Sequence, residues 1–394
     1  MDAENDTSNR IWPATGIWGA SYRIMFPLTA IWAIFSVTIW VVPFALMSVP
    51  NPMNWHIHEM VIGLGSAALL GYLPSAISSW TGRAPVTGWP VKAMAGLWIS
   101  ARLAMYFASY LPDWCVAVVN AAVFWSCAAV LISEALMGAV AKIWAYIAFL
   151  LIAGCVAGVS SAPDFGEPLL VIWLFVSLLT VVGTRMGYGF LQSQAQRNGE
   201  TVKPDQRWLT WIAVFAPLLL IVAFFELADG VVMARLVFLI GAMCLTIQCA
   251  NWPLKWAKGQ GLIIMTCVGV FWVPIGLWAV VLELFDLSPP SFSSTTHAPI
   301  MGALSSLIMA VMARPHARRT EAGLTTGPGV FAAFLFLQIA IFCRLADAVM
   351  ISFWVWVLAW GMFLVTVWPR IDAPIPRPIF SGTRQKRATI QSDH

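Results

Sequence analysis

The sequence predicts an all-α, polytopic membrane protein of about 12 transmembrane helices with both termini in the cytoplasm. Of its 394 residues, 60% are hydrophobic and only 10% are charged, whereas about a quarter of the residues in ordinary soluble domains are charged. Apolar stretches of roughly 20 residues, long enough to cross about 30 Å of hydrocarbon, recur from Tyr22 almost to Pro369. A soluble core cannot enclose so many apolar residues, so we expect the bilayer to be the main solvent.

Polar or Pro/Gly-rich joints divide the apolar residues into separate helices. The helices are expected at 22–48, 56–79, 90–110, 114–133, 140–162, 168–192, 208–229, 231–251, 261–285, 296–314, 327–346 and 348–368. They form a single transmembrane domain over residues 22–369, with a cytoplasmic N-terminal segment (1–21) and a basic cytoplasmic tail (370–394). The first 21 residues lack the apolar core of a cleaved signal peptide, so the first helix is expected to direct insertion.

The loops between these helices alternate in charge, which sets the orientation. One side carries Arg83, Lys92, Lys142, Arg197, Lys203, Arg207, Lys255, Lys258, Arg314, Arg318, Arg319 and the basic tail. The other carries Asp113, Asp164, Glu167, Glu226, Asp229, Glu283, Asp286 and Asp347. The positive-inside rule places the basic side in the cytoplasm. Tryptophans at predicted helix ends are expected as interfacial anchors: Trp55, Trp80, Trp89, Trp114, Trp208, Trp252, Trp256 and Trp368.

Composition excludes several classes of protein. The net charge of +4 is spread over short loops, so it gives no sign of a nucleic-acid partner. All seven cysteines fall in or beside apolar segments and suggest neither a disulfide framework nor a zinc finger. No Cys-x-x-Cys-His occurs, so any haem is held non-covalently.

Three of the five histidines fall in the same outer leaflet. His56 and His58 begin one helix and His297 begins another that starts from the same face. Imidazole is a frequent ligand of haem iron and copper, and Glu59 can hold such a ring by a hydrogen bond. In a regular helix Glu59 shares a face with His56, while His58 points away, so both histidines serve one centre only if the helix start is extended. The alternative is that interfacial histidines cap a helix or bind headgroups.

Methionines and small residues lie near these histidines in the sequence. Met60 and Met301 each follow a histidine by four residues, and thioether sulfur is a ligand for copper(I) or haem iron. With 17 methionines in the chain, this spacing can be accidental. Small residues at Gly63, Ala67 and Gly71 would admit a flat macrocycle or a neighbouring helix.

Intramembrane arginines narrow the site further. Arg102 and Arg344 lie toward the outer half of the bilayer, where an unpaired charge costs roughly 3 kcal/mol or more. Their candidate partners are Glu59, Asp347 or the carboxylates of a cofactor, and ordinary ion pairing is the alternative. Arg185, near the inner end of its helix, can reach the interface.

A faint internal repeat links the two histidine helices. His58 precedes Gly63 by five residues and Thr81 by 23, and His297 precedes Gly302 and Thr320 by the same intervals. A parallel duplication, as found in transporters, predicts such a match.

Several segments resemble the NnrS family. They are Trp55–Met60 with Gly63, Trp80–Pro85, Gly88–Pro90, Trp98 and Arg102–Ala104, and more weakly Thr184–Arg185, His297–Gly302, Met309, Met312 and Arg314. The resemblance implies a haem- and copper-containing protein of the bacterial cytoplasmic membrane, associated with nitric oxide metabolism and nitrosative stress. This chain departs from the family at Arg319–Ala322, where a His-Thr-Gly-Arg motif is expected, and in 263–278, which lacks a histidine.

The first hypothesis is therefore a haem or copper protein, or one holding both, that handles nitric oxide or another small diatomic ligand. His56, His58 and His297 are the candidate ligands with Met60 and Met301, and Glu59, Arg102 and Arg344 support the cofactor. The alternative is a secondary transporter of a small solute. A standard haem-copper oxidase or nitric oxide reductase is excluded by the number of histidines. The metal sites of such enzymes are expected to use six histidine ligands, and this chain offers three in one leaflet. No reaction and no protein partner follows from the sequence.

Overall fold

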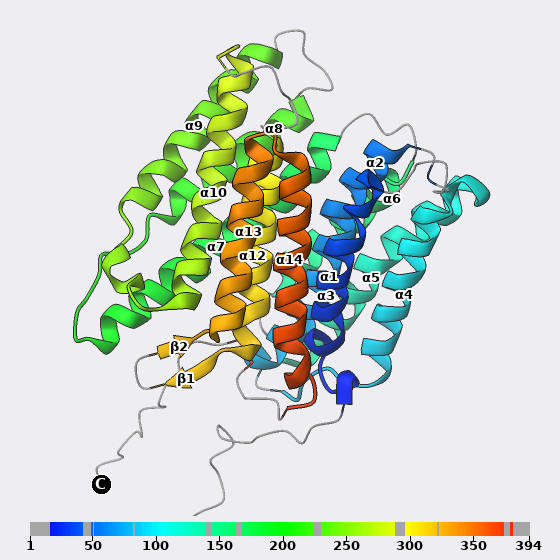
Figure 1. The fold of residues 1–394 in the computed structure, drawn as a ribbon, viewed down its shortest axis with the longest axis horizontal. Helices are drawn as coiled ribbons and strands as arrows, with labels where there is room; N and C mark the ends of the chain where they lie inside the picture. Colours follow the sequence, from blue (N-terminus) through cyan, green and yellow to red (C-terminus); the bar gives the residue numbers. More distant parts are fainter. Residues whose placement is uncertain are drawn as a thin grey trace, which may run out of the picture.

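The computed structural model describes residues 16–41, 49, 51–81, 83–138, 143–162, 168–223, 230–287, 296–320, 323–373 and 379–380. Long helices lie side by side in one bundle, with α9 at one flank and α4 at the other (Figure 1). Much of the N-terminal segment and the tail, together with Lys142, Asp164, Glu167, Glu226 and Asp229 of the predicted loops, lies outside the described residues.

Helices form within each of the predicted ranges. The α-helices are α1 (Ser21–Phe35), α2 (Pro52–His58), α3 (Leu64–Thr81), α4 (Trp89–Tyr106), α5 (Asp113–Gly138), α6 (Ile143–Val159), α7 (Pro168–Arg197), α8 (Arg207–Ala223), α9 (Gly230–Ala250), α10 (Gly261–Leu284), α12 (Ser305–Ala313), α13 (Pro328–Leu345) and α14 (Val349–Val367). Two π-helical segments, η5 (Glu59–Gly63) and η8 (Ala298–Leu304), lead into α3 and α12. Short 3-10 turns are η2 (Gly16–Trp18), η3 (Thr38–Trp40), η6 (Ala108–Tyr110), η7 (Leu254–Ala257), η9 (Arg314–His316) and η10 (Trp368–Arg370).

Eight helices in the described part of the chain are long and apolar enough to cross a membrane. They run over Ser21–Trp40, Pro52–Thr81, Asp113–Met137, Leu170–Arg197, Gly261–Leu284, Ala298–His316, Pro328–Leu345 and Val349–Arg370. Two shorter apolar helices, Ile143–Val159 and Ala234–Ala250, accompany them. The chain is thus a multi-pass, helical membrane protein.

The ends of the elements differ from the prediction in particular places. The predicted helix at 56–79 begins earlier, at Pro52, because the Asn51 side chain accepts a hydrogen bond from the Asn54 N–H at 3.1 Å and proline suits the first turn. After α12 the chain forms a short antiparallel pair of strands, β1 (Arg318–Thr320) and β2 (Gly323–Thr325), where only a loop was expected.

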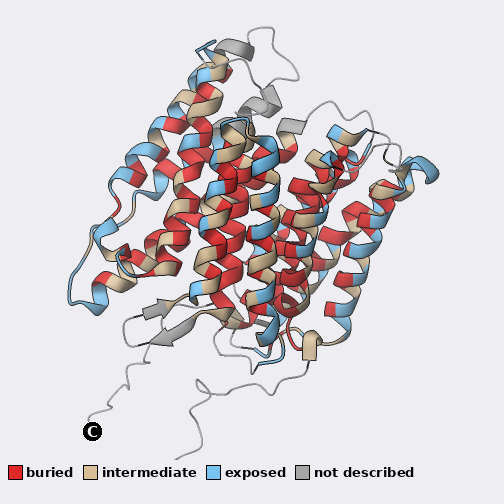
Figure 2. Ribbon diagram, viewed as in Figure 1, coloured by how far each residue is buried: buried red, intermediate tan, exposed pale blue. Residues whose placement is uncertain are grey.

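The burial of each residue depends on which face of its helix it occupies in the bundle. Buried residues line the inward faces of the helices, and exposed ones face outward (Figure 2). Of the predicted tryptophan anchors, Trp89, Trp114, Trp208 and Trp368 are exposed at helix ends. Trp55 and Trp252 are instead buried at 2% and 5% exposure, so these two pack inside the protein and the anchor prediction was wrong for them.

Candidate functional site

A buried, charged cluster joins the start of the second long helix to α4 and α5. Arg102 Nη1 donates to both carboxylate oxygens of Glu59 at 2.6 Å, and Arg102 Nη2 donates to Asn120 Oδ1 at 2.6 Å. His58 Nδ1 lies 3.1 Å from Glu59 Oε1. These four side chains are at most 3% exposed. The predicted pairing of Arg102 with Glu59 is therefore confirmed.

Glu59 is bonded to the histidine next to it in the chain. The backbone is still α-helical as far as Glu59, because the Glu59 N–H donates to the Trp55 and His56 carbonyl oxygens, and the π-helix η5 begins only at Glu59 itself. The shared helix face of His56 and Glu59 stays a prediction, while the Glu59 carboxylate turns to the neighbouring His58 ring. The His58 ring and the Glu59 carboxylate now form one hydrogen-bonded unit.

Close packing holds this unit in place. A Cβ on Gly63 would lie 2.5 Å from Glu59 Oε2 and 2.7 Å from Arg102 Nη1, so only glycine leaves room for the ion pair. Trp98 Nε1 donates to the Gly63 carbonyl oxygen at 3.0 Å, and the Arg102 guanidinium lies 5.8 Å from the Trp98 ring centre. An aromatic ring likewise fills the space at Gly71, where an added Cβ would lie 2.5 Å from Phe26.

The second nitrogen of His58 faces another electron-pair donor. Its Nε2 lies 3.5 Å from the carbonyl oxygen of Ala157 in α6. When the Nδ1–H of a neutral imidazole donates a hydrogen bond to the Glu59 carboxylate, Nε2 keeps a lone pair. A carbonyl oxygen only accepts hydrogen bonds, so it bonds directly to Nε2 only when Nε2 carries a proton. In the Nδ1–H tautomer, the two atoms can instead approach one cation.

His56 lies in a separate environment. Its Nδ1 is 3.2 Å from the Ser36 carbonyl oxygen and accepts from Trp40 Nε1 at 3.3 Å, so the ring is directed toward the end of α1 and η3. Met60, the neighbouring candidate ligand, accepts a hydrogen bond from Ser36 Oγ on its sulfur at 3.0 Å. The two histidines of the motif thus face different elements.

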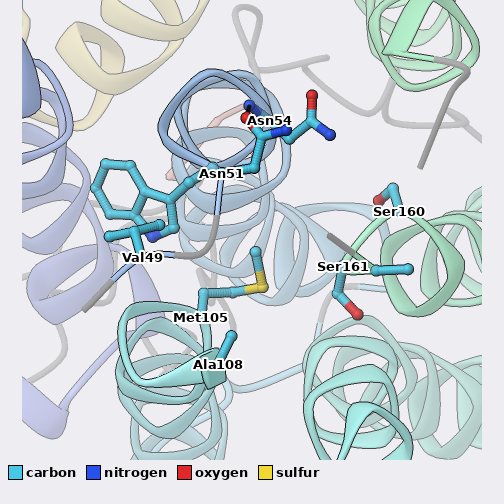
Figure 3. A pocket seen from close by; sticks show the side chains of 9 residues that line it. Val49, Asn51, Asn54, Met105, Ala108, Ser160 and Ser161 are labelled. Carbon is cyan, nitrogen blue, oxygen red and sulfur yellow. Dashed lines mark hydrogen bonds between the residues drawn. The ribbon is translucent and has the colours of Figure 1, made fainter. Parts of the chain in front are cut away.

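A small pocket lies one helical turn from the charged cluster, toward the end of the bundle where α2 begins. Its volume is about 20 Å³, and Trp55, Met105 and Ser161 are among its lining residues. Figure 3 shows Asn54 on one side, Ser160 and Ser161 on another, and the Met105 sulfur beneath them. Such a volume holds one water-sized molecule. It offers a small ligand a place close to His58.

The second histidine helix has its own polar group, which is neutral. Trp272 Nε1 donates to Gln338 Oε1 at 2.7 Å, and Gln338 Nε2 donates to Ser306 Oγ at 2.9 Å. His297 is half-buried at the start of η8, and Met301 within η8 is buried. Both η5 and η8 pack against α7.

The remaining predicted residues are placed as follows. Arg344 Nη1 pairs with Asp347 Oδ1 at 3.3 Å, with the Asp347 side chain 64% exposed, which confirms one proposed partner. Among the described residues, no group of three His, Cys, Asp or Glu side chains is arranged to hold a metal ion. A centre shared by His56, His58 and His297 stays a prediction.

The motifs in the sequence did not point to two groups of the site, a side-chain amide and a backbone carbonyl. Asn120 completes the coordination of Arg102 and donates to the Val116 carbonyl oxygen at 2.9 Å, and Ala157 supplies the carbonyl oxygen facing His58. Asn120 could have been found, because an amide inside an apolar helix calls for a buried partner. A backbone carbonyl carries no such signal.

The fold and this cluster define a class: a multi-pass helical membrane protein with a buried histidine–carboxylate–arginine site in its helical bundle. The sequence model of the NnrS protein family matches residues 16–374, nearly the whole chain, so the chain belongs to the NnrS family. Membership confirms the resemblance and identifies a protein related to the nitric oxide response. No curated protein matches the chain.

Proposed function

We propose that this NnrS protein binds a copper ion through His58 Nε2 and uses it to take up nitric oxide at the outer end of the bundle. The observation that supports this is the position of Nε2, 3.5 Å from a carbonyl oxygen that cannot donate to it, while Glu59 engages Nδ1. A carboxylate on the far nitrogen is the usual support of a metal-bound imidazole.

Copper and haem fit this site differently. A single ion needs donor atoms and little volume, and His58 provides a donor beside a pocket of about 20 Å³. A porphyrin needs a flat space many times larger. In the described part of the chain, the glycine positions that could have admitted one are filled by Glu59, Arg102, Trp32, Phe26 and Phe175. We therefore place no haem beside His58 and derive no step through one.

The residues of the chain then have distinct roles. Glu59 keeps the Nδ1 proton of His58 and so leaves Nε2 as the donor. Arg102 balances the Glu59 charge, and Asn120 holds Arg102 in position. Bound copper would supply an open coordination position for a diatomic ligand. The pocket lined by Asn54, Met105 and Ser161 would admit that ligand while excluding larger solutes.

We further propose 12 membrane spans with both termini in the cytoplasm of a bacterial inner membrane. In support, helices occupy all twelve predicted ranges, and eight of them are long and apolar enough to cross by themselves. The basic residues Arg83, Lys255 and Arg370 then lie on the cytoplasmic side, as the positive-inside rule requires.

The test is metal content and spectroscopy of the detergent-purified protein, produced with copper and haem available. We expect about one copper per chain, no Soret band, and an electron paramagnetic resonance signal that changes when nitric oxide is added. His58→Ala should remove the copper, and His56→Ala, the matched control, should retain it. Copper retained in His58→Ala, or a Soret band lost in that variant, would overturn the assignment. Solute uptake by proteoliposomes lacking copper would favour the transporter alternative.

A further inference from the structure

A second, mostly apolar cavity lies between α3, α6, α7 and the helix formed by η8 and α12. Its volume is about 40 Å³ and it is partly open, whereas one water-sized group needs roughly 10–15 Å³. The lining residues are Gly65, Ala68, Leu69, Tyr72, Leu73, Tyr146, Phe175, Leu178, Leu179, Val182, Leu304, Ile308 and Val311. No residue of the His58 cluster is among them, so this cavity is a different site.

The polar groups of the cavity gather at one end. Among the described residues that line it, Tyr72 and Tyr146 are the two with a hydroxyl group. Both interact electrostatically with Arg185 of α7. Arg185 follows Leu178 and Val182 on the same face of α7, one turn beyond the residues that line the cavity. A cation therefore lies at the mouth of an apolar space.

A second arginine lies at the polar end of the cavity. Arg314, one residue beyond α12, interacts electrostatically with Tyr72 and donates to the Phe380 carbonyl oxygen through Nη2. The Phe380 ring lies 4.9 Å from the Tyr72 ring, edge to face. The described tail residues thus cover the Arg314 side of the mouth. This end carries β1 and β2 in Figure 1, which is the basic, cytoplasmic side by charge.

Arg185 is the unusual residue of the group. It is exposed although it lies within the apolar span Leu170–Arg197. Among the described residues, no carboxylate forms an ion pair with it and no hydrogen bond from its guanidinium is present. A guanidinium at this depth costs several kcal/mol unless an anion or water accompanies it.

We infer that this cavity binds an anionic phospholipid of the cytoplasmic leaflet. The phosphate accepts hydrogen bonds from Arg185 and from the hydroxyl of Tyr146, and part of an acyl chain enters the space between Ala68, Leu179 and Ile308. Basic pockets between transmembrane helices on the cytoplasmic side bind anionic headgroups, and guanidinium suits phosphate geometry. The site is independent of copper at His58.

Native mass spectrometry of the full-length protein in mild detergent tests this inference. The probes are dioctanoyl phosphatidylglycerol, dioctanoyl phosphatidylcholine and inorganic phosphate. We expect one phosphatidylglycerol to bind at least tenfold more tightly than phosphatidylcholine, with no competition from equimolar phosphate. Arg185→Gln should weaken phosphatidylglycerol at least fivefold. Ala68→Leu, which fills the apolar end, should weaken both lipids.

The matched control is Arg235→Gln. Arg235 of α9 is likewise partly exposed, but it lies 3.7 Å from Asp286 and away from the cavity, so its loss should leave lipid binding unchanged. Equal binding of the two lipids would overturn the inference. So would full phosphatidylglycerol affinity in Arg185→Gln and Ala68→Leu, or displacement of the lipid by phosphate alone, which would mean that the arginines hold a free anion.

Discussion

Breaking the ion pair between Glu59 and Arg102 should destabilise the protein more than breaking any exposed pair. Glu59→Gln keeps the size of the side chain and removes its charge. Arg102 is then left 3% exposed, with two of its 2.6 Å bonds to carboxylate oxygens replaced by contacts to a neutral amide. The perturbation therefore isolates the electrostatic contribution of the pair.

The expected magnitude follows from burial. Removing one partner of a buried ion pair costs about 3–5 kcal/mol, because the other charge remains uncompensated. Arg102→Gln should give a similar loss, leaving the Glu59 carboxylate with only His58 and neutral donors. The double variant should lose less than the sum of the two single variants, with a coupling of about 1–3 kcal/mol for residues in direct contact.

The assay is unfolding in mixed micelles by increasing fractions of sodium dodecyl sulfate, followed by far-UV circular dichroism. Arg344→Gln is the control, because its partner Asp347 has a side chain 64% exposed, and exposed pairs contribute about 1 kcal/mol or less. The reasoning is refuted if Glu59→Gln and Arg102→Gln each change the free energy of unfolding by no more than the control does, or if the two effects simply add.

Three further changes test other parts of the structure. Gly63→Ala should lower stability by about 1–3 kcal/mol in the same assay because its methyl group has no space, whereas Gly96→Ala, with nothing within 4 Å, should be neutral or stabilising; equal effects would contradict the packing. Trp272→Phe removes the donor to Gln338 Oε1, 2.7 Å away, and should cost about 1–3 kcal/mol, a loss that adding Gln338→Leu should partly reverse. Alkaline phosphatase fused after the last residue should be inactive and a fluorescent protein at the same position bright; the opposite pattern would place the C-terminus outside.

Hydropathy and charge were enough to predict the helices, because spans of about 20 apolar residues leave few alternatives. The same logic put Glu59 and Asp347 among the candidate partners of Arg102 and Arg344, since a charge in hydrocarbon requires a counter-ion, and the structure pairs Arg102 with Glu59 and Arg344 with Asp347. Trp55 and Trp252 show its limit: a tryptophan near a helix end can face lipid or pack inward, and hydropathy is the same in both cases.

The geometry of the site could not be derived from the sequence, because helical-face arguments place a residue on its helix but do not fix the rotamer of its side chain. Glu59 turns to the neighbouring His58, while His56 bonds with Ser36 and Trp40. From Glu59 to Gly63 the helix is a π-helix, so residues beyond this segment also depart from 3.6 residues per turn relative to the histidines. π-helical turns are frequent at functional sites, but their hydrogen bonds leave no clear pattern in one sequence.

The two π-helices strengthen the case for an internal repeat. Each follows a histidine by no more than one residue, and each contains the glycine five residues after that histidine, Gly63 in η5 and Gly302 in η8. A tryptophan of the preceding long helix packs on each glycine: Trp32 Nε1 and the Trp272 ring would lie 2.7 and 2.6 Å from an added Cβ. A duplication of the two histidine helices predicts these three matches.

The two halves differ in chemistry, and the difference agrees with the copper site that we propose at His58. Around η5 the polar groups are an ion pair and a histidine bonded to the carboxylate, whereas around η8 they are the neutral side chains of Ser306, Gln338 and Trp272. Neutral groups already bonded to one another neither orient an imidazole nor balance the charge of a bound cation. The η8 half, which lacks the histidines expected from the family resemblance, thus also lacks a charged side chain in this polar group. Regular α-helical hydrogen bonding through 59–63 or 298–304 in an experimental structure would contradict both the repeat and this division of roles.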